Sequence, residues 1–276
     1  MQVKGHDIGV CSWSLRTKDM GELVGAVKSL GLGHMQLGVG PLVMLDDKRK
    51  HYELGQLRSS GIALTGTMMG FADEDYASIA KIRETGGFLP DSMWALRKKL
   101  TGAAAKLSAE LGAKLMTMHV GFVPHKGQAG YEVMLGRIRE IAGLLEAQGI
   151  TLIMETGQEP AEELLGFLND LKAKNVAINF DPANMVLYGA GDPIAAIGVL
   201  GKHIRHVHVK DAIASKKPGV EWGEEVPFGM GQVGARRFLE ALEKTGYRGA
   251  LVFEREAGED RMGDVRKGIE AVKAHA

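Results

Sequence analysis

The chain has 276 residues, of which 45% are hydrophobic and 25% are charged, a composition that is ordinary for a globular protein. Its 34 Lys and Arg residues balance 34 Asp and Glu residues, so no net charge attracts polyanions or acidic membranes, and we expect neither nucleic acid nor a membrane as a partner. The single cysteine, Cys11, excludes an internal disulfide framework and is typical of a reducing compartment. No apolar run is long enough for a signal-peptide core or a membrane span, so the expected localisation is cytoplasmic.

Eight apolar runs alternate with helical patterns along the chain, and we take the runs as strands and the patterns as helices. The predicted strands cover 8–15, 34–39, 63–70, 115–121, 152–157, 177–182, 205–211 and 251–256. The predicted helices cover 20–31, 46–60, 91–111, 128–148, 161–174, 193–202, 233–245 and 261–275. Asp19 or Thr17 can cap the first helix. The long polar segment 71–90 is predicted to be a lid or a binding loop.

A helix separates each predicted strand from the next, which indicates a parallel sheet. Eight strand–helix units without a linker predict the α/β class and a single (β/α)8 TIM barrel, with residues 1–276 as one domain. The alternative, an open doubly wound sheet, needs a G-x-G-x-x-G turn after an early strand, and none follows the first strand. In a barrel, the chemistry lies at the carboxyl ends of the strands.

Each of the last four predicted strands carries one polar residue near its end. These residues are Glu155, Asp181, His208 and Glu254. A carboxylate in a strand that is buried on both faces is costly unless it is paired or bound to a metal. Side chains alternate along a strand, and the alternation places all four on the face that would line a barrel interior. Any one of them is explained equally well as a strand-end residue satisfied by a loop, but four at the same depth predict a shared divalent cation.

The chemistry of this group favours particular ions and a particular reaction. Three carboxylates and one imidazole suit Mn²⁺ first, with Mg²⁺, Co²⁺ or Zn²⁺ as alternatives, and no CxxC or HExxH pattern indicates a common zinc site. An open coordination position would polarise a carbonyl and stabilise an enediolate oxygen. Glu155 and Glu254 would face each other across a substrate carbon, as a catalytic pair that removes and returns a proton.

Four motifs, ETGQEP, NFDPANM, HVHVKD and FEREAG, resemble those of the sugar phosphate isomerase/epimerase family of xylose isomerase-like TIM barrels, which includes the ketose 3-epimerases. The resemblance covers nearly the whole chain and is strongest from Met116 onward. It implies that Glu155, Asp181, His208 and Glu254 bind one metal ion, with the two glutamates as acid and base. It also implies that the second histidine of HxH is the ligand, so His206 supports the site from behind.

The chain departs from the ketose 3-epimerase pattern in three places. Asn184 stands where a histidine follows the metal-binding Asp by three residues, and Ala161 stands where a glutamate follows the first metal-binding Glu by six. No arginine matches the one expected a few residues after the metal-binding His. The metal site therefore transfers to this chain, whereas the identity of the sugar does not.

Five residues are candidates for contacts with a carbohydrate substrate: His119, Asn184, Lys210, Trp13 and Trp222. His119 ends the fourth predicted strand, Lys210 shares the parity of His208, and Trp13 is placed on the first strand. Each also has a plainer explanation as a core, turn or solvated residue. Gly229-Met230-Gly231 lies where many barrels bind phosphate, but glycines in a turn explain it equally well.

The sequence therefore predicts a divalent-metal-dependent sugar isomerase or epimerase that transfers a proton through a metal-bound enediolate. A keto-sugar dehydratase or lyase is the first alternative, because it begins with the same proton abstraction. An endonuclease IV-like repair enzyme is less favoured, because its zinc site needs histidines that Met68, Met69 and Asn184 do not supply. A non-catalytic sugar-binding barrel is also less favoured, because all four metal residues are present. The substrate class is a small carbohydrate, phosphorylated or not, and a homo-oligomer is compatible with the sequence.

Overall fold

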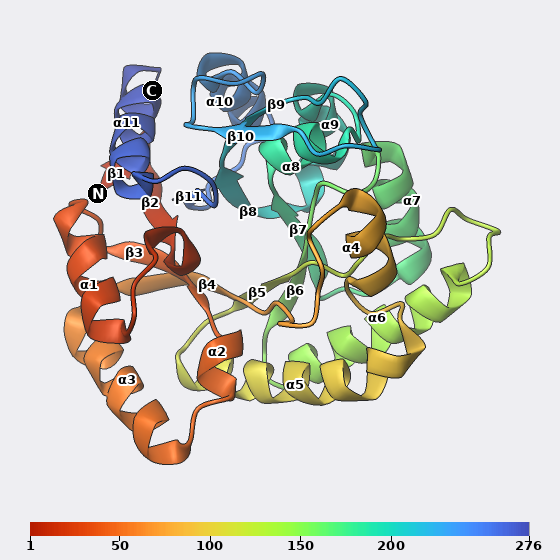
Figure 1. The fold of residues 1–276 in the computed structure, drawn as a ribbon, viewed down its shortest axis with the longest axis horizontal. Coiled ribbons are helices and arrows are strands. Elements are labelled where there is room, and N and C mark those ends of the chain that lie inside the picture. Colours follow the sequence, from red (N-terminus) through yellow and green to blue (C-terminus); the bar gives the residue numbers. More distant parts are fainter. Residues whose placement is uncertain (276) are drawn as a thin grey trace.

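The computed structural model describes residues 1–275 and shows a closed barrel of eight parallel strands surrounded by helices (Figure 1). The strands are β1 Gln2–Val3, β2 His6–Cys11, β3 His34–Gly38, β4 Ala63–Met68, β5 Leu115–Met118, β6 Thr151–Glu155, β7 Val176–Phe180, β8 Ile204–Val209, β9 Asp211–Ile213, β10 Glu224–Val226 and β11 Leu251–Phe253. The α-helices are α1 Met20–Ser29, α2 Gly40–Val43, α3 Asp47–Ser60, α4 Ile79–Thr85, α5 Asp91–Glu110, α6 Tyr131–Glu146, α7 Ala161–Leu171, α8 Pro182–Tyr188, α9 Pro193–Leu200, α10 Ala235–Lys244 and α11 Arg261–Ala274. The 3-10 helices are η1 Ser12–Leu15 and η2 Gly201–His203.

The barrel closes because β2 pairs in parallel with both β3 and β11. From β3 to β8 each strand pairs with the next in sequence, and β8 pairs with β11. This arrangement confirms the predicted (β/α)8 TIM barrel. Three short strands lie outside the barrel: β1 pairs antiparallel with β2, and β9 and β10 form a separate antiparallel pair.

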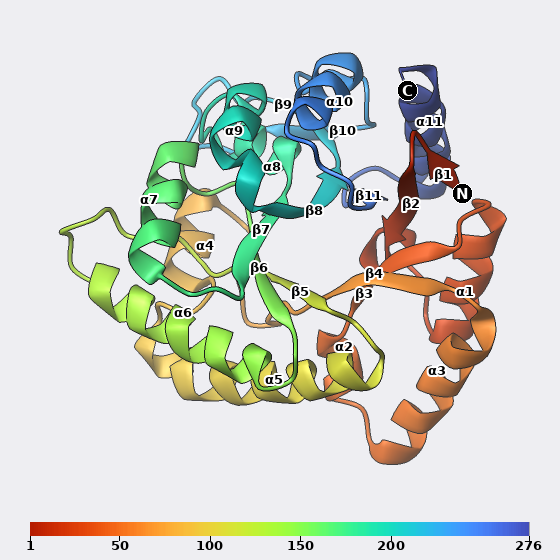
Figure 2. The same cartoon turned by 180° about the vertical axis from the view of Figure 1, so that it is seen from behind.

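The helices form the outer layer of the barrel in both views (Figures 1 and 2). The strand residues that alternate with the four polar ones, including Ile178, Phe180, Val207 and Phe253, are buried in the main hydrophobic core. Asp19 caps α1, because its side chain accepts a hydrogen bond from the backbone N–H of Glu22. Within residues 1–275, every helix falls short of the length and apolar character that crossing a bilayer requires.

Three local differences from the predicted elements affect the site. The first strand ends at Cys11, and Trp13 lies in the 3-10 turn η1 rather than on the strand as predicted. The fourth barrel strand, β5, ends at Met118, so His119 follows it instead of ending it. Helix α8 was not predicted, although Asp181 at its N-cap and Pro182 at its first position are a typical start of a helix.

Candidate metal centre

Four buried side chains meet at the carboxyl ends of β6, β7, β8 and β11. Glu155, Asp181, His208 and Glu254 each offer one ligand atom, and these atoms all lie within 4.8 Å of one another. The exposed fractions of the four residues do not exceed 6%. The sheet register supports the convergence, because Glu155 pairs with Asn179 on β7, two residues before Asp181. The structure therefore brings together the four residues that the strand pattern singled out.

His208 faces the three carboxylates with its Nδ1 atom. Nδ1 lies 3.1 Å from Glu155 Oε1 and 3.4 Å from both Asp181 Oδ2 and Glu254 Oε2. The Nε2 atom lies 2.6 Å from Gln36 Oε1, across the ring from the carboxylates. Nδ1 is thus the ring nitrogen that is directed at the centre of the group.

Two carboxylate oxygens in this group are buried without a hydrogen-bond partner among residues 1–275. They are Glu155 Oε2 and Asp181 Oδ2. A buried polar atom left unpaired costs free energy, and a charged one costs more. Three carboxylates and one imidazole form a donor set that divalent ions such as Mn²⁺, Mg²⁺ and Co²⁺ prefer. The residues present therefore fit a divalent metal ion, and the group could hold one.

Lys210 lies beside the four residues and is only 2% exposed. Its Nζ atom is 2.7 Å from Glu254 Oε2 and 2.8 Å from Glu256 Oε2, and it is 3.9 Å from Asp181 Oδ2. Burial alone would lower the pKa of Lys210, but the surrounding carboxylates raise it well above its usual range. The ammonium is therefore a fixed positive charge at the edge of the group, unlike most strand-end lysines, which are solvated.

The pKa values within the group reflect burial and these neighbouring charges. Burial would raise the pKa of Glu254, but Lys210 and His208 bring it well below its usual range. Burial raises the pKa of Asp181 to about 6, although Lys210 opposes the rise. Burial would lower the pKa of His208, but the carboxylates of Glu254 and Glu155 raise it well above its usual range. Without a metal, the imidazole is therefore expected to carry a proton toward the carboxylates.

Three of the predicted substrate contacts lie directly beside the two glutamates. Trp13 Nε1 donates a hydrogen bond of 2.7 Å to Glu254 Oε1, and Asn184 Nδ2 donates one of 3.0 Å to Glu155 Oε1. His119 Nε2 lies 3.5 Å from Glu155 Oε2. Gly157 allows Asn184 to approach, because a Cβ atom at position 157 would lie 2.6 Å from the Cβ atom of Asn184. Each glutamate is thus contacted by side chains from segments that follow other barrel strands.

Trp222 lies in a small apolar cluster beyond this group. The cluster comprises Ile79, Ile82, Phe122 and Tyr188, with Trp222 packed against it. The rings of Tyr188 and Trp222 are 4.7 Å apart, and Tyr188 is four residues after Asn184 on α8, which places it one helical turn beyond the glutamates. The cluster joins four segments that follow the carboxyl ends of β4, β5, β7 and β8. It lies on the side of the barrel where the four candidate ligands lie, and we call its three aromatic residues, Phe122, Tyr188 and Trp222, the aromatic roof.

His206 supports His208 through an intermediate residue. Its Nδ1 atom lies 2.7 Å from Asn179 Oδ1, and its Nε2 atom lies 3.0 Å from Thr65 Oγ1. The Nδ2 atom of Asn179 is in turn 3.2 Å from His208 Nε2. Burial brings the pKa of His206 well below its usual range, so the ring is neutral. The sequence placed His206 behind the group but missed Asn179 and Gln36, the two amides that contact His208.

The glycines considered for phosphate binding are occupied by a carboxylate of the protein itself. Asp211 Oδ2 accepts hydrogen bonds of 3.0 Å from the backbone N–H groups of Gly229 and Gly231. Asp211 Oδ1 accepts bonds of 2.9 Å from the N–H groups of Val233 and Ala212. Because these amides already bind an anion, the turn is explained by Asp211.

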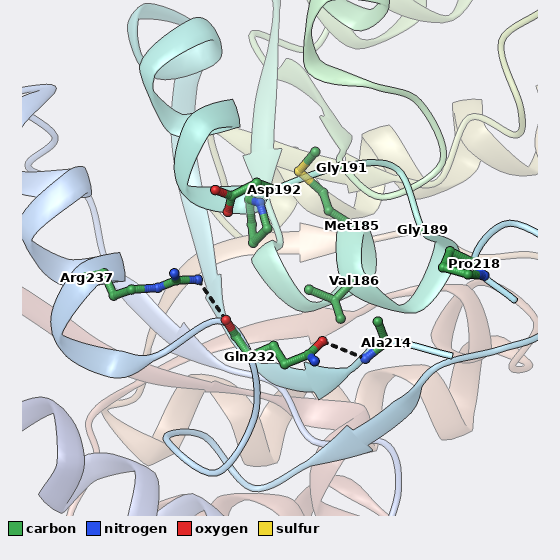
Figure 3. A pocket seen from close by; sticks show the side chains of 10 residues that line it. Met185, Val186, Gly189, Gly191, Asp192, Ala214, Pro218, Gln232 and Arg237 are labelled. Atoms are coloured by element: carbon green, nitrogen blue, oxygen red, sulfur yellow. Dashed lines mark hydrogen bonds between the residues drawn. The ribbon is translucent and has the colours of Figure 1, made fainter. Parts of the chain in front are cut away.

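Two cavities of the protein lie away from this group of residues. One, of about 330 Å³, is lined by Met185 and Val186 of α8 and by Asp192, Gln232 and Arg237 (Figure 3). In it, Gln232 accepts from the backbone N–H of Ala214 through its side chain and from Arg237 through its backbone carbonyl. The second, of about 480 Å³, lies between the loop after β5 and α7. The four converging residues line neither cavity, so volume alone does not locate the site.

The barrel and its four converging side chains define the class of this protein. The chain matches the family described as xylose isomerase-like TIM barrel over residues 24–275, and it belongs to that family. The resemblance seen in the four sequence motifs is therefore confirmed. Among curated proteins, the uncharacterized protein YihM of Escherichia coli (strain K12) is 29% identical over 98 residues, which are 30% of this chain and only 29% of the length of that protein.

Solved structures share the fold over the whole chain. A xylose isomerase domain protein from Planctomyces limnophilus has a TM-score of 0.87 and 28% identity, covering 99% of this chain and 98% of that one. A xylose isomerase-like TIM barrel protein from Mycobacterium smegmatis in complex with magnesium has a TM-score of 0.74 and 16% identity, with 100% of both chains covered. D-Psicose 3-epimerase with D-tagatose from Clostridium cellulolyticum H10 has a TM-score of 0.71 and 17% identity, with 98% of both covered. The last two are similar to this chain in fold.

Proposed function

We propose that this protein is a divalent-metal-dependent sugar isomerase or epimerase in which Glu155 and Glu254 move a proton at a carbon next to a carbonyl. One observation carries the proposal: three carboxylates and an imidazole converge at the carboxyl ends of barrel strands, and two of the buried carboxylate oxygens accept no hydrogen bond from residues 1–275. The family and the sugar epimerase among the similar structures support the reaction class. Fold alone does not choose a reaction, so the site must decide it.

Glu155, Asp181, His208 and Glu254 would hold the ion. The donor set favours Mn²⁺, with Mg²⁺, Co²⁺ or Zn²⁺ as alternatives, and the magnesium complex of the Mycobacterium smegmatis protein supports a divalent ion in this fold. When bound, the ion supplies Lewis-acid polarisation of a carbonyl oxygen, which makes the neighbouring C–H more acidic.

The two glutamates differ in their surroundings, which suits a pair that alternates between base and acid. Glu254 is held as a carboxylate by Lys210, which keeps its pKa well below the usual range against the effect of burial. Glu155 is flanked by His119 and His208, which lower its pKa against burial. Glu155 ends β6 and Glu254 directly follows β11, and two strands, β7 and β8, lie between these two in the barrel. A substrate carbon between them would lose a proton to one and receive a proton from the other on the opposite face.

The residues around the glutamates would bind and orient the substrate. Lys210 is a cationic donor beside the carboxylates, and Glu155 raises the pKa of His119 against the effect of burial. Either side chain could donate a hydrogen bond to a substrate oxygen on which negative charge develops. Trp13 forms one wall, and Trp222 with the aromatic roof is proposed to limit the far end of the substrate. Asn184 bonds to Glu155 and lies 3.3 Å from Lys210 Nζ. Because it replaces a histidine of the ketose 3-epimerases, we propose a sugar other than their ketoses.

The test is a screen of ketoses, keto-glycosides and their phosphates in D₂O, with the purified protein saturated with Mn²⁺. The expected result is one solvent deuterium at the carbon next to the carbonyl, in a product that is an isomer or epimer of the substrate. A product that has lost water would assign the site to a dehydratase or lyase instead. Substantial product formation by Glu254→Gln with its metal bound would contradict the proposed role of Glu254. Deuterium entry without product would not, because Glu155 could still exchange a proton on its own face of the substrate.

A further inference from the structure

Gln36 contributes to the metal centre from the opposite side of the barrel, although it belongs to none of the sequence motifs. It lies on β3 and is fully buried, in register with Cys11 of β2. Its Oε1 atom is 2.6 Å from His208 Nε2, and its Nε2 atom donates a hydrogen bond of 2.5 Å to Thr117 Oγ1. A glutamine in the interior of a barrel strand would be costly to bury without such partners.

The orientation of the Gln36 amide follows from the donors around it. The Cys11 thiol donates a hydrogen bond of 3.5 Å to Gln36 Oε1. The Cys11 S–H is thus directed at an amide carbonyl oxygen, and such an oxygen has a second lone pair to offer to His208 Nε2. The NH₂ group is directed at a hydroxyl oxygen, which can accept.

The second amide near His208 leaves both ring nitrogens free in the plane of the ring. Asn179 Nδ2 lies 3.3 Å from His208 Nδ1 and 3.2 Å from His208 Nε2. An atom at nearly equal distance from both nitrogens must lie over the face of the imidazole, because ring atoms block such a position in the plane. The nearest partner of Nε2 is Gln36 Oε1 at 2.6 Å, with Cys11 Sγ farther away at 3.6 Å, and the nearest partner of Nδ1 is Glu155 Oε1 at 3.1 Å.

We propose that Gln36 is a positioning residue of the metal centre: its amide oxygen accepts the Nε2–H of His208 and so fixes the tautomer in which the Nδ1 lone pair faces the ion. In a neutral imidazole one nitrogen carries the proton and the other is free to ligate. The hydrogen bond made by the non-ligating nitrogen usually decides which is which, and such partners tune metal affinity. This inference rests on the proposed metal centre, but it requires no particular substrate.

The first test uses the unaltered chain. Long-range ¹H–¹⁵N NMR spectra of protein labelled with [¹⁵N]histidine are recorded with Mg²⁺ at saturation, and His208 is assigned from its loss in His208→Gln. The expected spectrum shows a protonated Nε2 and an unprotonated, metal-bound Nδ1. A proton on Nδ1, or ligation through Nε2, would overturn the proposal without any variant of Gln36.

The second test compares three variants by Mn²⁺ titration calorimetry and the same NMR experiment. Gln36→Met has a similar size but no acceptor, and it should bind Mn²⁺ about 10–100-fold more weakly, the usual range for loss of such a partner. Gln36→Glu keeps an acceptor oxygen and should retain the Nε2–H tautomer. Thr65→Val is the matched control, because it removes an acceptor from Nε2 of His206, 3.0 Å away, rather than from His208.

The outcomes separate this inference from the proposed function. If Gln36→Met folds and binds Mn²⁺ as tightly as the parent protein does, Gln36 does not position His208. If it loses affinity no more than Thr65→Val does, the effect is one of general packing and the proposal also fails. Intact metal binding and the expected tautomer, without turnover of any carbohydrate, would instead count against the isomerase proposal alone.

Discussion

Lys210→Met provides a sharp test of the electrostatics of the site. The variant removes a buried ammonium and leaves the carboxylates of Glu254 and Glu256 without the cation between them. With an effective dielectric constant of about 20, the Coulomb energy of the Lys210–Glu254 pair at 2.7 Å is about 6 kcal/mol. Desolvation of the lysine offsets part of this, and breaking a buried ion pair typically costs about 3–5 kcal/mol.

We therefore expect metal-free Lys210→Met to lose about 3 kcal/mol of stability, which corresponds to a fall in Tm of about 6–12 °C if 1 kcal/mol shifts Tm by about 2–4 °C. The loss should depend on pH in a definite direction. Glu254 has a depressed pKa, so it contributes stability that is present above its unfolded pKa and is lost as the pH falls through its folded pKa. Without Lys210 that pKa rises, and protonation relieves the buried charge in acid. The variant should thus be closest to the parent protein near pH 5 and furthest from it near pH 8.

The assay is differential scanning calorimetry between these pH values, with and without Mn²⁺. Lys210→Arg, which keeps the positive charge, is the control, and Mn²⁺ should restore part of the lost stability because it replaces the missing cation. If metal-free Lys210→Met melts within about 2 °C of the parent protein at pH 8, which corresponds to no more than about 1 kcal/mol, the ammonium does not compensate the buried carboxylates and the reasoning is wrong.

Three further outcomes are expected. Glu155→Gln and Glu254→Gln should each lose more turnover than their loss of bound metal explains, because an amide cannot accept the proton. Turnover that excess Mn²⁺ restored would contradict this. His206→Asn should lose about 10–100-fold in turnover and recover partly with added metal. Mn²⁺ affinity, measured by calorimetry, should rise between pH 5 and pH 8, because the pKa of Asp181 is raised to about 6 by burial and protons compete with the ion below that pH; a flat profile would argue against Asp181 as a ligand. Asp211→Ala removes the acceptor of four backbone N–H groups and should cost about 1–3 kcal/mol in urea denaturation; an unchanged midpoint would show that the turn does not depend on this carboxylate.

The sequence located the four converging residues because alternation along a strand is a strong signal. Glu155, Asp181, His208 and Glu254 each lie near the end of a strand-like run, at a position whose alternation places it on the interior face of the barrel. The barrel followed from the regular alternation of strands and helices. The ends of the elements were less well predicted, because short turns such as η1 and the pair β9–β10 have too few residues to show a period.

Residues that act through partners far along the chain were beyond prediction. Lys210 was a candidate substrate contact with a solvated lysine as the plainer explanation, and nothing local in the sequence reveals its ion pairs with Glu254 and Glu256. Gln36 gave a weak signal, as a polar residue in the middle of the apolar run HMQLGV, but its partner His208 is 172 residues away. Helix α8, in contrast, is predictable from the sequence, because an aspartate followed by a proline is a typical helix start.

Asp181 divides its two oxygens between two tasks, and this has a consequence for how the site can change. Oδ1 accepts the backbone N–H of Asn184 and begins helix α8, while Oδ2 faces the imidazole of His208. The same helix carries Asn184 to Glu155 and Tyr188 to the aromatic roof. A substitution of Asp181 would therefore remove the N-cap of α8 as well as the proposed metal ligand, so evolution cannot change one without the other. The substrate specificity would change more readily through substitutions in the segments of the aromatic roof, because these would leave the four converging side chains in place.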